Sequence, residues 1–217
     1  MKPVRLNIGC GMAVTEGWVN YDNSLSVRLA GYPGGVAMLL KAMRLVGGEQ
    51  AGYIDYCRRN DVRHCNAVKR IPHTDQSVDV IYTSHMLEHL DRTDAARFLS
   101  EARRVLKTGG TIRTAVPDLG KAVDSYKENG DSDAFMESIL VAAPPLRTFG
   151  DKLKLLATGY RHHQWMYDGN SLLKLLNEND FSNPEILAAG ETTIPDPGAL
   201  DLRERADGSV YVEAKKP

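Results

Sequence analysis

The chain has 217 residues with 27 basic and 28 acidic side chains, so its formal net charge is −1. This length suits one sizeable domain that can bury a core without disulfide or metal staples. The near-zero charge provides no global basic field, so we expect no nucleic-acid partner. The three cysteines Cys10, Cys57 and Cys65 are scattered without a CxxC pair, which excludes a disulfide framework and a thiolate metal site and suits a reducing compartment.

The N-terminal residues do not have the pattern of a targeting segment. Asn7 and the glycines after it interrupt any apolar signal-peptide region. The apolar run Val36–Leu40 is far too short to span a bilayer. We therefore expect a soluble, cytoplasmic protein without a transmembrane segment.

The segment Val4–Gly11, VRLNIGCG, predicts a short strand that ends at a Gly-Cys-Gly turn. Closely spaced glycines let the backbone bend sharply and let a ligand approach without meeting a Cβ. Because open α/β sheets bind ligands at the carboxyl ends of their strands, this turn is a candidate ligand site. A glycine turn without a ligand is the plainer alternative.

The segment Trp18–Asp22, WVNYD, predicts a second strand that ends in an acid. Only Met12–Gly17 lie between the two, whereas parallel strands normally need a crossover of about a dozen or more residues. Either the connection is an unusually tight loop or the strand assignment is wrong. A dinucleotide's pyrophosphate needs a helix N-terminus at that turn, and GCGMAV lacks the third glycine of GxGxxG. The sequence thus favours a phosphate-free ligand over NAD.

Apolar runs bounded by turn residues predict further strands. They are Val62–Val68, Val78–Thr83, Thr111–Leu119, Glu185–Ala188 and Ser209–Ala214. Apolar residues at three- and four-residue spacing predict a helix over about 92–107, capped by Asp91 or Thr93 and ended by Gly109-Gly110. A leucine-rich stretch over 172–176 predicts another helix.

Two helical insertions, at about 24–60 and 121–168, interrupt what we expect to be a single domain over 1–217. The first holds an apolar segment over 36–46, which we interpret as a helix covering the sheet; a lid or a membrane-surface helix is the alternative. The second is broken by Pro144-Pro145 and follows a strand's carboxyl end. It would therefore overhang the ligand crevice.

Six short segments occur in a characteristic order: LNIGCG, GWVNYD, HCNAV, VDVIYTSHMLEHL, RVLKTGG and TAVPDL. In this order they resemble the class I S-adenosylmethionine-dependent methyltransferases, and most of all a small bacterial branch of the type-11 group. The resemblance extends to RHHQWMYDGNSLLKLL and the tail SVYVEAKKP. It implies an α/β, Rossmann-like fold: a seven-stranded, mostly parallel sheet with helices on both faces, helical lid insertions and an antiparallel last strand.

The resemblance also implies S-adenosylmethionine as cofactor. It gives Gly9, Cys10 and Gly11 as the turn against the methionine part, and Asp22 as the acid that holds the ribose hydroxyls. A carboxylate can accept from both vicinal hydroxyls through charge-assisted hydrogen bonds. The alternative for Asp22 is a turn residue that merely ends the strand.

Other positions match the family's cofactor contacts less closely. Asn66-Ala67 fall where the family often has an acid for the adenine amino group, and an Asn carbonyl can still accept there. Asn7 stands where many relatives carry Asp, which leaves less negative charge near the cofactor's ammonium. Ser84 and His85 end a strand beside the cofactor in this family.

The letters His85-Met86-Leu87-Glu88-His89 also fit HxxEH, a zinc-peptidase signature. A zinc hydrolase would need a further ligand, for which Glu101 is the nearest candidate downstream. Because the motif is short and false positives are frequent, we favour a turn stabilised by Glu88 and His89 and expect no metal. The zinc hydrolase stays as a third alternative.

Methyl transfer from a sulfonium is an in-line displacement, so alignment and exclusion of water are the protein's main tasks. A hydroxyl or amine acceptor also needs a base, and imidazole has a suitable pKa near neutrality. His85 and His163 are the candidate catalytic residues, with His162 behind them. A hydrogen-bonded structural role is the alternative for each.

Three more residues are candidates for contact with the acceptor. Trp165 and Tyr167 adjoin the histidines, although core or lid packing would also explain them. Asp118 follows Pro117 and either contacts a ligand or caps the next helix. We expect O- or N-methylation of a small molecule, with a sugar or polysaccharide precursor as the family-level guess. A non-catalytic cofactor-binding protein is the alternative, favoured mildly by Asn7 and Asn66.

Overall fold

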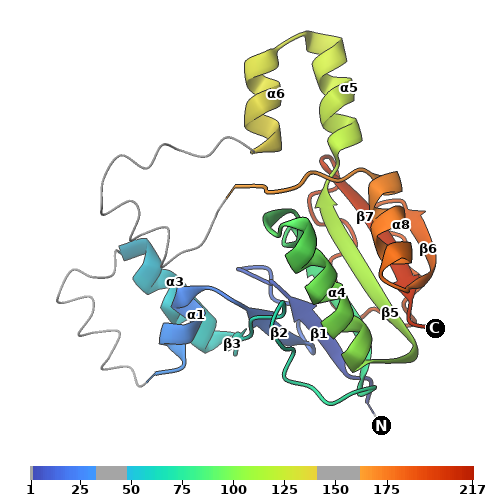
Figure 1. Cartoon of the computed structure of the whole chain (residues 1–217). Coiled ribbons are helices and arrows are strands. Elements are labelled where there is room, and N and C mark those ends of the chain that lie inside the picture. The colour runs from blue at the N-terminus through green and yellow to red at the C-terminus, as the bar shows by residue number, and fades with distance from the viewer. Residues whose placement is uncertain (1, 33–47, 141–161) are drawn as a thin grey trace.

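The computed structural model describes residues 2–32, 48–140 and 162–217. Its strands form one seven-stranded sheet in the order β3-β2-β1-β4-β5-β7-β6 (Figure 1). The strands are β1 (Arg5–Ile8), β2 (Val19–Asp22), β3 (Arg63–His64), β4 (Val78–Ser84), β5 (Leu106–Pro117), β6 (Ser182–Leu187) and β7 (Ser209–Lys215). The first five run parallel to their neighbours, and β7 is antiparallel to both β5 and β6. The predicted sheet, including its antiparallel last strand, is confirmed.

The helices follow the predicted order with shifted ends. They are α1 (Leu25–Ala30), α3 (Gly48–Arg59), the 3-10 turn η1 (Leu87–His89), α4 (Arg92–Val105), α5 (Leu119–Asn129), α6 (Ser132–Ile139) and α8 (Gly169–Glu178). Asp91 caps α4 as predicted, accepting the Asp94 backbone N–H over 2.8 Å. The prediction that Gly109-Gly110 end this helix is wrong: α4 ends at Val105, and both glycines lie within β5.

The connection between β1 and β2 is the tight loop that the sequence left as one of two alternatives. The two strands are parallel neighbours, with Leu6 opposite Val19. Asn7, in β1, holds this loop: its side-chain amide donates to the carbonyl of Ala13 over 2.8 Å. Asn20 accepts the Thr15 backbone N–H over 2.8 Å. Since each strand has only four residues, this short loop can return the chain to the amino edge without a helix.

The main core lies between one face of the sheet and helices α4 and α8, as Figure 1 shows. Leu6, Ile81, Phe98, Leu99, Ile112 and Leu176 are among its fully buried side chains. A second cluster covers the opposite face over β4, β5 and β7. There Ile194 and Leu200, from the segment between β6 and β7, pack with Trp18 and Tyr211.

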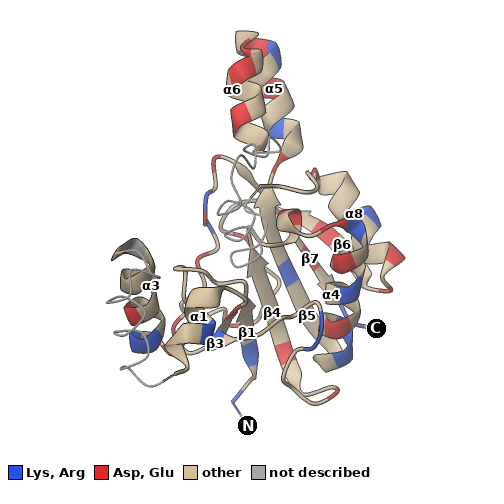
Figure 2. Ribbon diagram, turned by 60° about the vertical axis from the view of Figure 1, so that its left-hand side comes forward, with Lys and Arg blue, Asp and Glu red and all other residues tan. Residues whose placement is uncertain are grey.

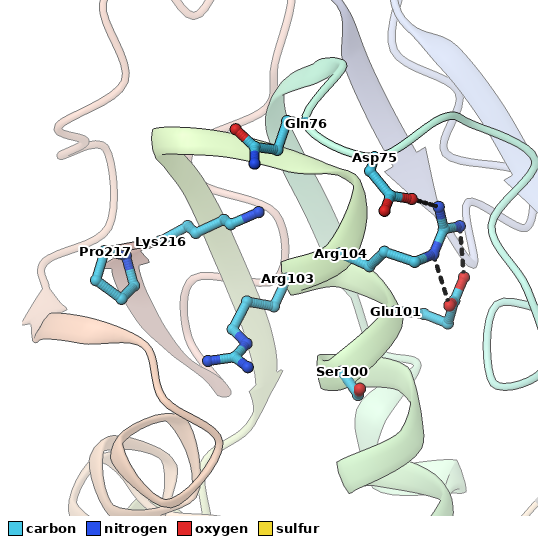
Figure 3. A pocket seen from close by; sticks show the side chains of 8 residues that line it. All are labelled: Asp75, Gln76, Ser100, Glu101, Arg103, Arg104, Lys216 and Pro217. Atoms are coloured by element: carbon cyan, nitrogen blue, oxygen red, sulfur yellow. Dashed lines mark hydrogen bonds and ion pairs between the residues drawn. The ribbon is translucent and has the colours of Figure 1, made fainter.

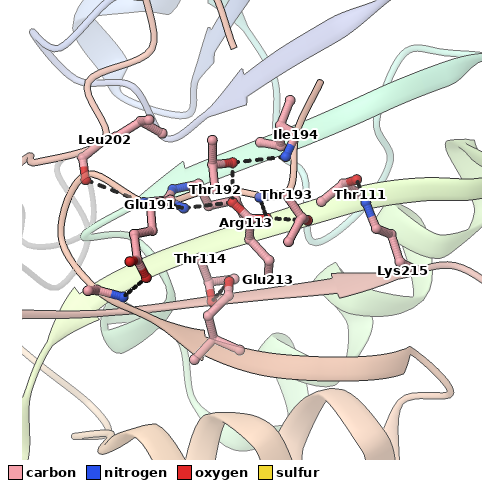
Figure 4. Close-up of polar contacts among 12 residues, drawn as sticks. Thr111, Arg113, Thr114, Glu191, Thr192, Thr193, Ile194, Leu202, Glu213 and Lys215 are labelled. Carbon is pink, nitrogen blue, oxygen red and sulfur yellow. Dashed lines mark hydrogen bonds and ion pairs between the residues drawn. The ribbon is translucent and has the colours of Figure 1, made fainter. Parts of the chain in front are cut away.

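An ion pair with no exposed surface anchors that segment to the sheet (Figure 4). Arg113 of β5 donates to Glu213 of β7 over 2.6 Å and to the carbonyl of Glu191 over 2.9 Å. Glu213 also accepts from the hydroxyls of Thr192 and Thr193. Burial raises the pKa of Glu213, but the hydrogen bonds from these two threonines and from Arg113 outweigh it, so the pKa lies below its usual value.

The two predicted insertions are partly described. In the first, α1 and α3 pack against each other and against Cys10 in a separate apolar cluster. In the second, α5 and α6 form a hairpin that projects beyond the carboxyl end of β5 (Figures 1 and 2). The apolar segment over 36–46 and Pro144-Pro145 lie outside the described residues. Among the helices that are described, none is long and apolar enough to cross a bilayer.

Candidate functional site

The glycine turn lies where the sequence placed it, at the carboxyl end of β1. Gly9 and Gly11 have φ of +75° and +51°, the left-handed region that favours glycine. The backbone N–H groups of Gly9 and Cys10 both donate to the carbonyl of Tyr21, over 2.8 and 3.0 Å. The turn therefore folds across the end of β2.

Asp22 ends β2 directly beside this turn. Its Oδ2 accepts the backbone N–H of Gly11 over 3.2 Å, and its Oδ1 accepts that of Ser24 over 2.8 Å. The backbone N–H of Cys65 donates to the Asp22 carbonyl over 3.1 Å, so the turn after β3 adjoins it as well. A carboxylate has about four lone-pair directions, and these two hydrogen bonds leave capacity for further donors.

Cys10 faces inward from the turn rather than toward a ligand. Its side chain is buried with Val27 and Cys57. Burial, followed by the nearby charge of Asp22, raises the pKa of the Cys10 thiol to about 12. Cys10 is thus a neutral packing residue, and the ligand-facing part of the turn is its backbone.

The turn after β4 touches the glycine turn through Met86. A Cβ on Gly9 would lie 2.6 Å from Cγ of Met86, so only glycine fits this contact without displacing it. A Cβ on Gly11 would meet no atom within 4 Å. The space beside Gly11 is therefore open, whereas that beside Gly9 is filled by protein.

The HxxEH segment forms this second turn. His85 has φ of +49°, and η1 follows directly. His85 Nε2 lies 2.9 Å from the Ser209 hydroxyl, and its Nδ1 lies 3.4 Å from Oε1 of Glu88. Because Ser209 has only 2% exposed surface, this Ser-His-Glu arrangement is not accessible to a substrate as a nucleophile.

His163, predicted from a distant segment, lies against the same carboxylate. Its Nε2 is 3.9 Å from Oε1 of Glu88, and its Nδ1 is 2.7 Å from the carbonyl of Ile139. Burial lowers the pKa of the His163 imidazole. The carbonyl of the neighbouring His162 lies 3.3 Å from Nδ1 of His89. The structure therefore brings together both predicted catalytic histidines, around Glu88.

The other predicted ligand residues divide into two groups. Asn66-Ala67 lie in the turn after β3 that adjoins Asp22, and Ser84 ends β4 next to His85. Asn7, by contrast, is 1% exposed and holds the β1–β2 loop, so it does not face the crevice.

The predicted acceptor contacts differ in exposure. Asp118 caps α5 by accepting the Gly120 N–H over 2.9 Å, which was its structural alternative. Tyr167 has no exposed surface and belongs to the main core, so it offers no face to an acceptor. Trp165 is 46% exposed, and the Arg92 guanidinium lies 5.3 Å from its ring centroid.

A pocket at the opposite, amino edge of the sheet has no part in this site. It is lined by Ser100, Arg103, Lys216 and their neighbours (Figure 3). Arg104 pairs there with Glu101 and Asp75. Glu101, which also accepts the Ile71 N–H over 2.9 Å, is therefore engaged with Arg104 and is not a ligand beside the HxxEH turn.

Comparison with known proteins identifies the family of this chain. Residues 6–114 match the family model described as a methyltransferase domain. The chain belongs to this family. This methyltransferase domain is 42% identical over 60 residues, 28% of its length, to a probable S-adenosylmethionine-dependent methyltransferase of Mycolicibacterium smegmatis. Over 134 residues, 62% of its length, it is 27% identical to an uncharacterized 37.1 kDa protein in transposon Tn4556 of Streptomyces fradiae.

The matched region covers 22% and 36% of these two relatives, so both are considerably longer than the shared part. A solved structure from Thermotoga maritima, a methyltransferase described as a possible histamine N-methyltransferase, has the same fold. Its TM-score is 0.52 at 16% identity, over 100% of this chain and 84% of that one. The family is that of S-adenosylmethionine-dependent methyltransferases, so S-adenosylmethionine is the cofactor.

Proposed function

We propose that this methyltransferase domain binds S-adenosylmethionine at the glycine turn and transfers its methyl group to a small-molecule acceptor, by O- or N-methylation. One observation carries the proposal: the Asp22 carboxylate and the Gly11 backbone are hydrogen-bonded to each other at the carboxyl edge. An acid for the ribose and a glycine turn for the amino-acid part therefore share one side of the sheet.

Each neighbouring turn has a proposed part in holding the cofactor. The remaining lone pairs of Asp22 accept the ribose hydroxyls. The backbone from Gly9 to Gly11 lies along the methionine part, and Asn66-Ala67 take the adenine. Ser84, which ends β4 next to β1, and His85, which follows it, have the proposed position between the cofactor and the acceptor.

The proposed chemistry is in-line displacement at the sulfonium carbon. Holding the two reactants in line supplies up to about 7–11 kcal/mol of barrier lowering. His85 is the proposed general base for an acceptor hydroxyl or amine, a role worth about 10²–10⁴-fold in rate. Trp165, exposed beside the histidines, is the proposed acceptor contact. A sugar or a polysaccharide precursor is the proposed acceptor class.

Methyl-labelled S-adenosylmethionine with a panel of sugars, phenols and amines tests this proposal. Label should pass to at least one acceptor class, and His85→Ala should slow transfer more than it weakens cofactor binding. Cofactor binding without transfer to any acceptor would instead favour the non-catalytic alternative. Absence of cofactor binding would contradict the proposal itself.

A further inference from the structure

We propose that Glu88, His89 and His163 form a site for a divalent transition-metal ion, with zinc the best match to the ligand set. The carboxylate and the two imidazoles each offer one ligand atom, and these atoms all lie within 4.8 Å of one another. The sequence led us to expect no metal, because HxxEH supplied only part of a ligand set. His163 adds an imidazole from a segment more than 70 residues away.

Glu88 is buried without a hydrogen bond. Its side chain is 1% exposed, and among the described residues neither of its carboxylate oxygens has a hydrogen-bond partner. An unpaired buried carboxylate is strongly disfavoured, and such groups are normally paired with a cation or bound to a metal. A cation beside Oε1 and Oε2 would stabilise this carboxylate.

The imidazoles of His89 and His163 are oriented with Nε2 toward Glu88. Nδ1 of His163 lies 2.7 Å from the Ile139 carbonyl, and Nδ1 of His89 lies 3.3 Å from the His162 carbonyl. A carbonyl only accepts, so each Nδ1 carries a hydrogen, and the neutral form of each ring has its lone pair on Nε2. Both Nε2 atoms face Glu88. Metal-binding histidines are held in this way, by an Nδ1–H bond to a carbonyl or a carboxylate.

The distances between the ligand atoms also suit a metal ion better than hydrogen bonds. Nε2 of His89 and His163 lie 4.0 and 3.9 Å from Oε1 of Glu88. These separations are too long for hydrogen bonds, which span about 2.7–3.2 Å. Ligands about 2.0–2.2 Å from a tetrahedral zinc ion lie about 3.4 Å from one another. The ligand atoms lie within 4.8 Å of one another, so each pair must approach to about 3.4 Å when the ion binds.

Two imidazoles and one carboxylate are a ligand set that zinc takes in sites with an open fourth position. His85, whose Nδ1 is 3.4 Å from Oε1 of Glu88, is left outside this ligand set because it is the proposed general base. Bound there, the ion would tie the segment after residue 161 to the turn that contacts Gly9. The metal site lies beside the proposed cofactor turn. The metal-site proposal does not depend on whether the protein transfers methyl groups.

The experiment is metal analysis of the full chain, purified, stripped with a chelator, and reloaded with Zn²⁺ alone. The wild type should retain about one equivalent after gel filtration, as a three-ligand site predicts. His89→Ala, chosen because its side chain is 33% exposed and so tolerates truncation, should lose it. Loss of a ligand should weaken Zn²⁺ binding by more than the about 10–100-fold that follows loss of an outer hydrogen bond.

Two further ligand variants and one control variant complete the test. Glu88→Gln and His163→Ala should lose the ion as His89→Ala does, while His64→Ala, an exposed histidine on β3, should retain it. Circular dichroism checks that each variant is folded. Zn²⁺ should also raise the Tm of the wild type and not that of His89→Ala. No bound Zn²⁺ in the wild type, or equal binding in His89→Ala and His64→Ala, would overturn the proposal.

Discussion

The backbone N–H of Gly11 donates to Oδ2 of Asp22 over 3.2 Å, joining the turn after β1 to the acid that ends β2. The short loop between the strands makes this contact possible, because it brings β2 back as the direct parallel neighbour of β1. A glycine turn and a carboxylate thus meet without a helix between them.

Gly9→Ala should destabilise the protein. The new Cβ would lie 2.6 Å from Cγ of Met86 on a backbone with φ of +75°, and left-handed φ costs an L-residue about 1–2 kcal/mol. Urea denaturation measures the change in the free energy of unfolding. Gly208→Ala is the matched control, because its Cβ would meet nothing within 4 Å. Equal effects of the two substitutions would contradict the described packing at Met86.

Cys10 should resist alkylation in the folded protein. Its pKa is raised to about 12 by burial and by Asp22, and the thiolate is the reactive form. At pH 8, iodoacetamide should therefore label Cys10 far more slowly in the native protein than in urea. Peptide mapping by mass spectrometry follows each cysteine. Rapid native labelling of Cys10 would show that the turn does not pack as described.

Glu213→Gln should be among the most destabilising single substitutions, because it leaves Arg113 buried without its partner charge. Removing one partner of a buried pair costs about 3–5 kcal/mol. The pKa of Glu213 is lowered in the folded state. Its stabilising contribution is therefore present above the unfolded pKa of about 4.3 and is lost as pH falls through the folded pKa.

The difference in unfolding free energy between wild type and Glu213→Gln should thus be largest near neutral pH and shrink in acid. Denaturation at a series of pH values measures it. A difference that stays constant, or that grows as pH falls, would mean that the carboxylate is not the charged partner of Arg113.

Asp168→Ala should cost about 1 kcal/mol, the usual value for an N-cap. Asp168 accepts the Ser171 backbone N–H over 2.7 Å, and Ser171 in turn accepts the Asp168 N–H over 2.9 Å. The helix that it caps, α8, buries three leucines. Loss of the cap should therefore lower the free energy of unfolding of the whole domain. Asp131 caps α6, which has no buried residue, and Asp131→Ala should leave the global Tm unchanged. Thermal unfolding of both variants checks this contrast.

Much of the fold was predictable because local patterns agree with it. The apolar run of β4 and the spaced apolar face of α4 each identify one structure, and Asp91 marks a helix start. The prediction that Gly109-Gly110 end the helix failed because hydrogen bonds to a distant strand hold these glycines in β5. Gly109 donates to the carbonyl of Lys216 and Gly110 accepts from the Lys216 N–H, which extends β5 backward through both glycines. The residues next to Gly109-Gly110 in the sequence do not predict this pairing with Lys216.

Those parts of the candidate site that lie in a single turn could be predicted from the sequence. Those parts that form where distant segments of the chain meet could not. Asp22 and Gly11 were identified from their positions at strand ends. Asn7 was predicted to lie near the cofactor, yet its side-chain amide holds the β1–β2 loop. The prediction failed because the short motif around Asn7 does not show which face of the sheet its side chain occupies. The meeting of His163 with Glu88 depends on the path of the chain between them, which no motif encodes.

The central claim is that Asp22 and the glycine turn hold S-adenosylmethionine. Calorimetry with S-adenosylhomocysteine, the demethylated product, tests it most directly in the wild type, in Asp22→Ala and in the exposed control Asp61→Ala. Hydrogen bonds to a charged group are worth about 1.5–3 kcal/mol, so Asp22→Ala should bind about 10–100-fold more weakly than wild type, and Asp61→Ala as wild type does. Equal affinity of folded Asp22→Ala and wild type, or no binding by the wild type, would contradict the claim.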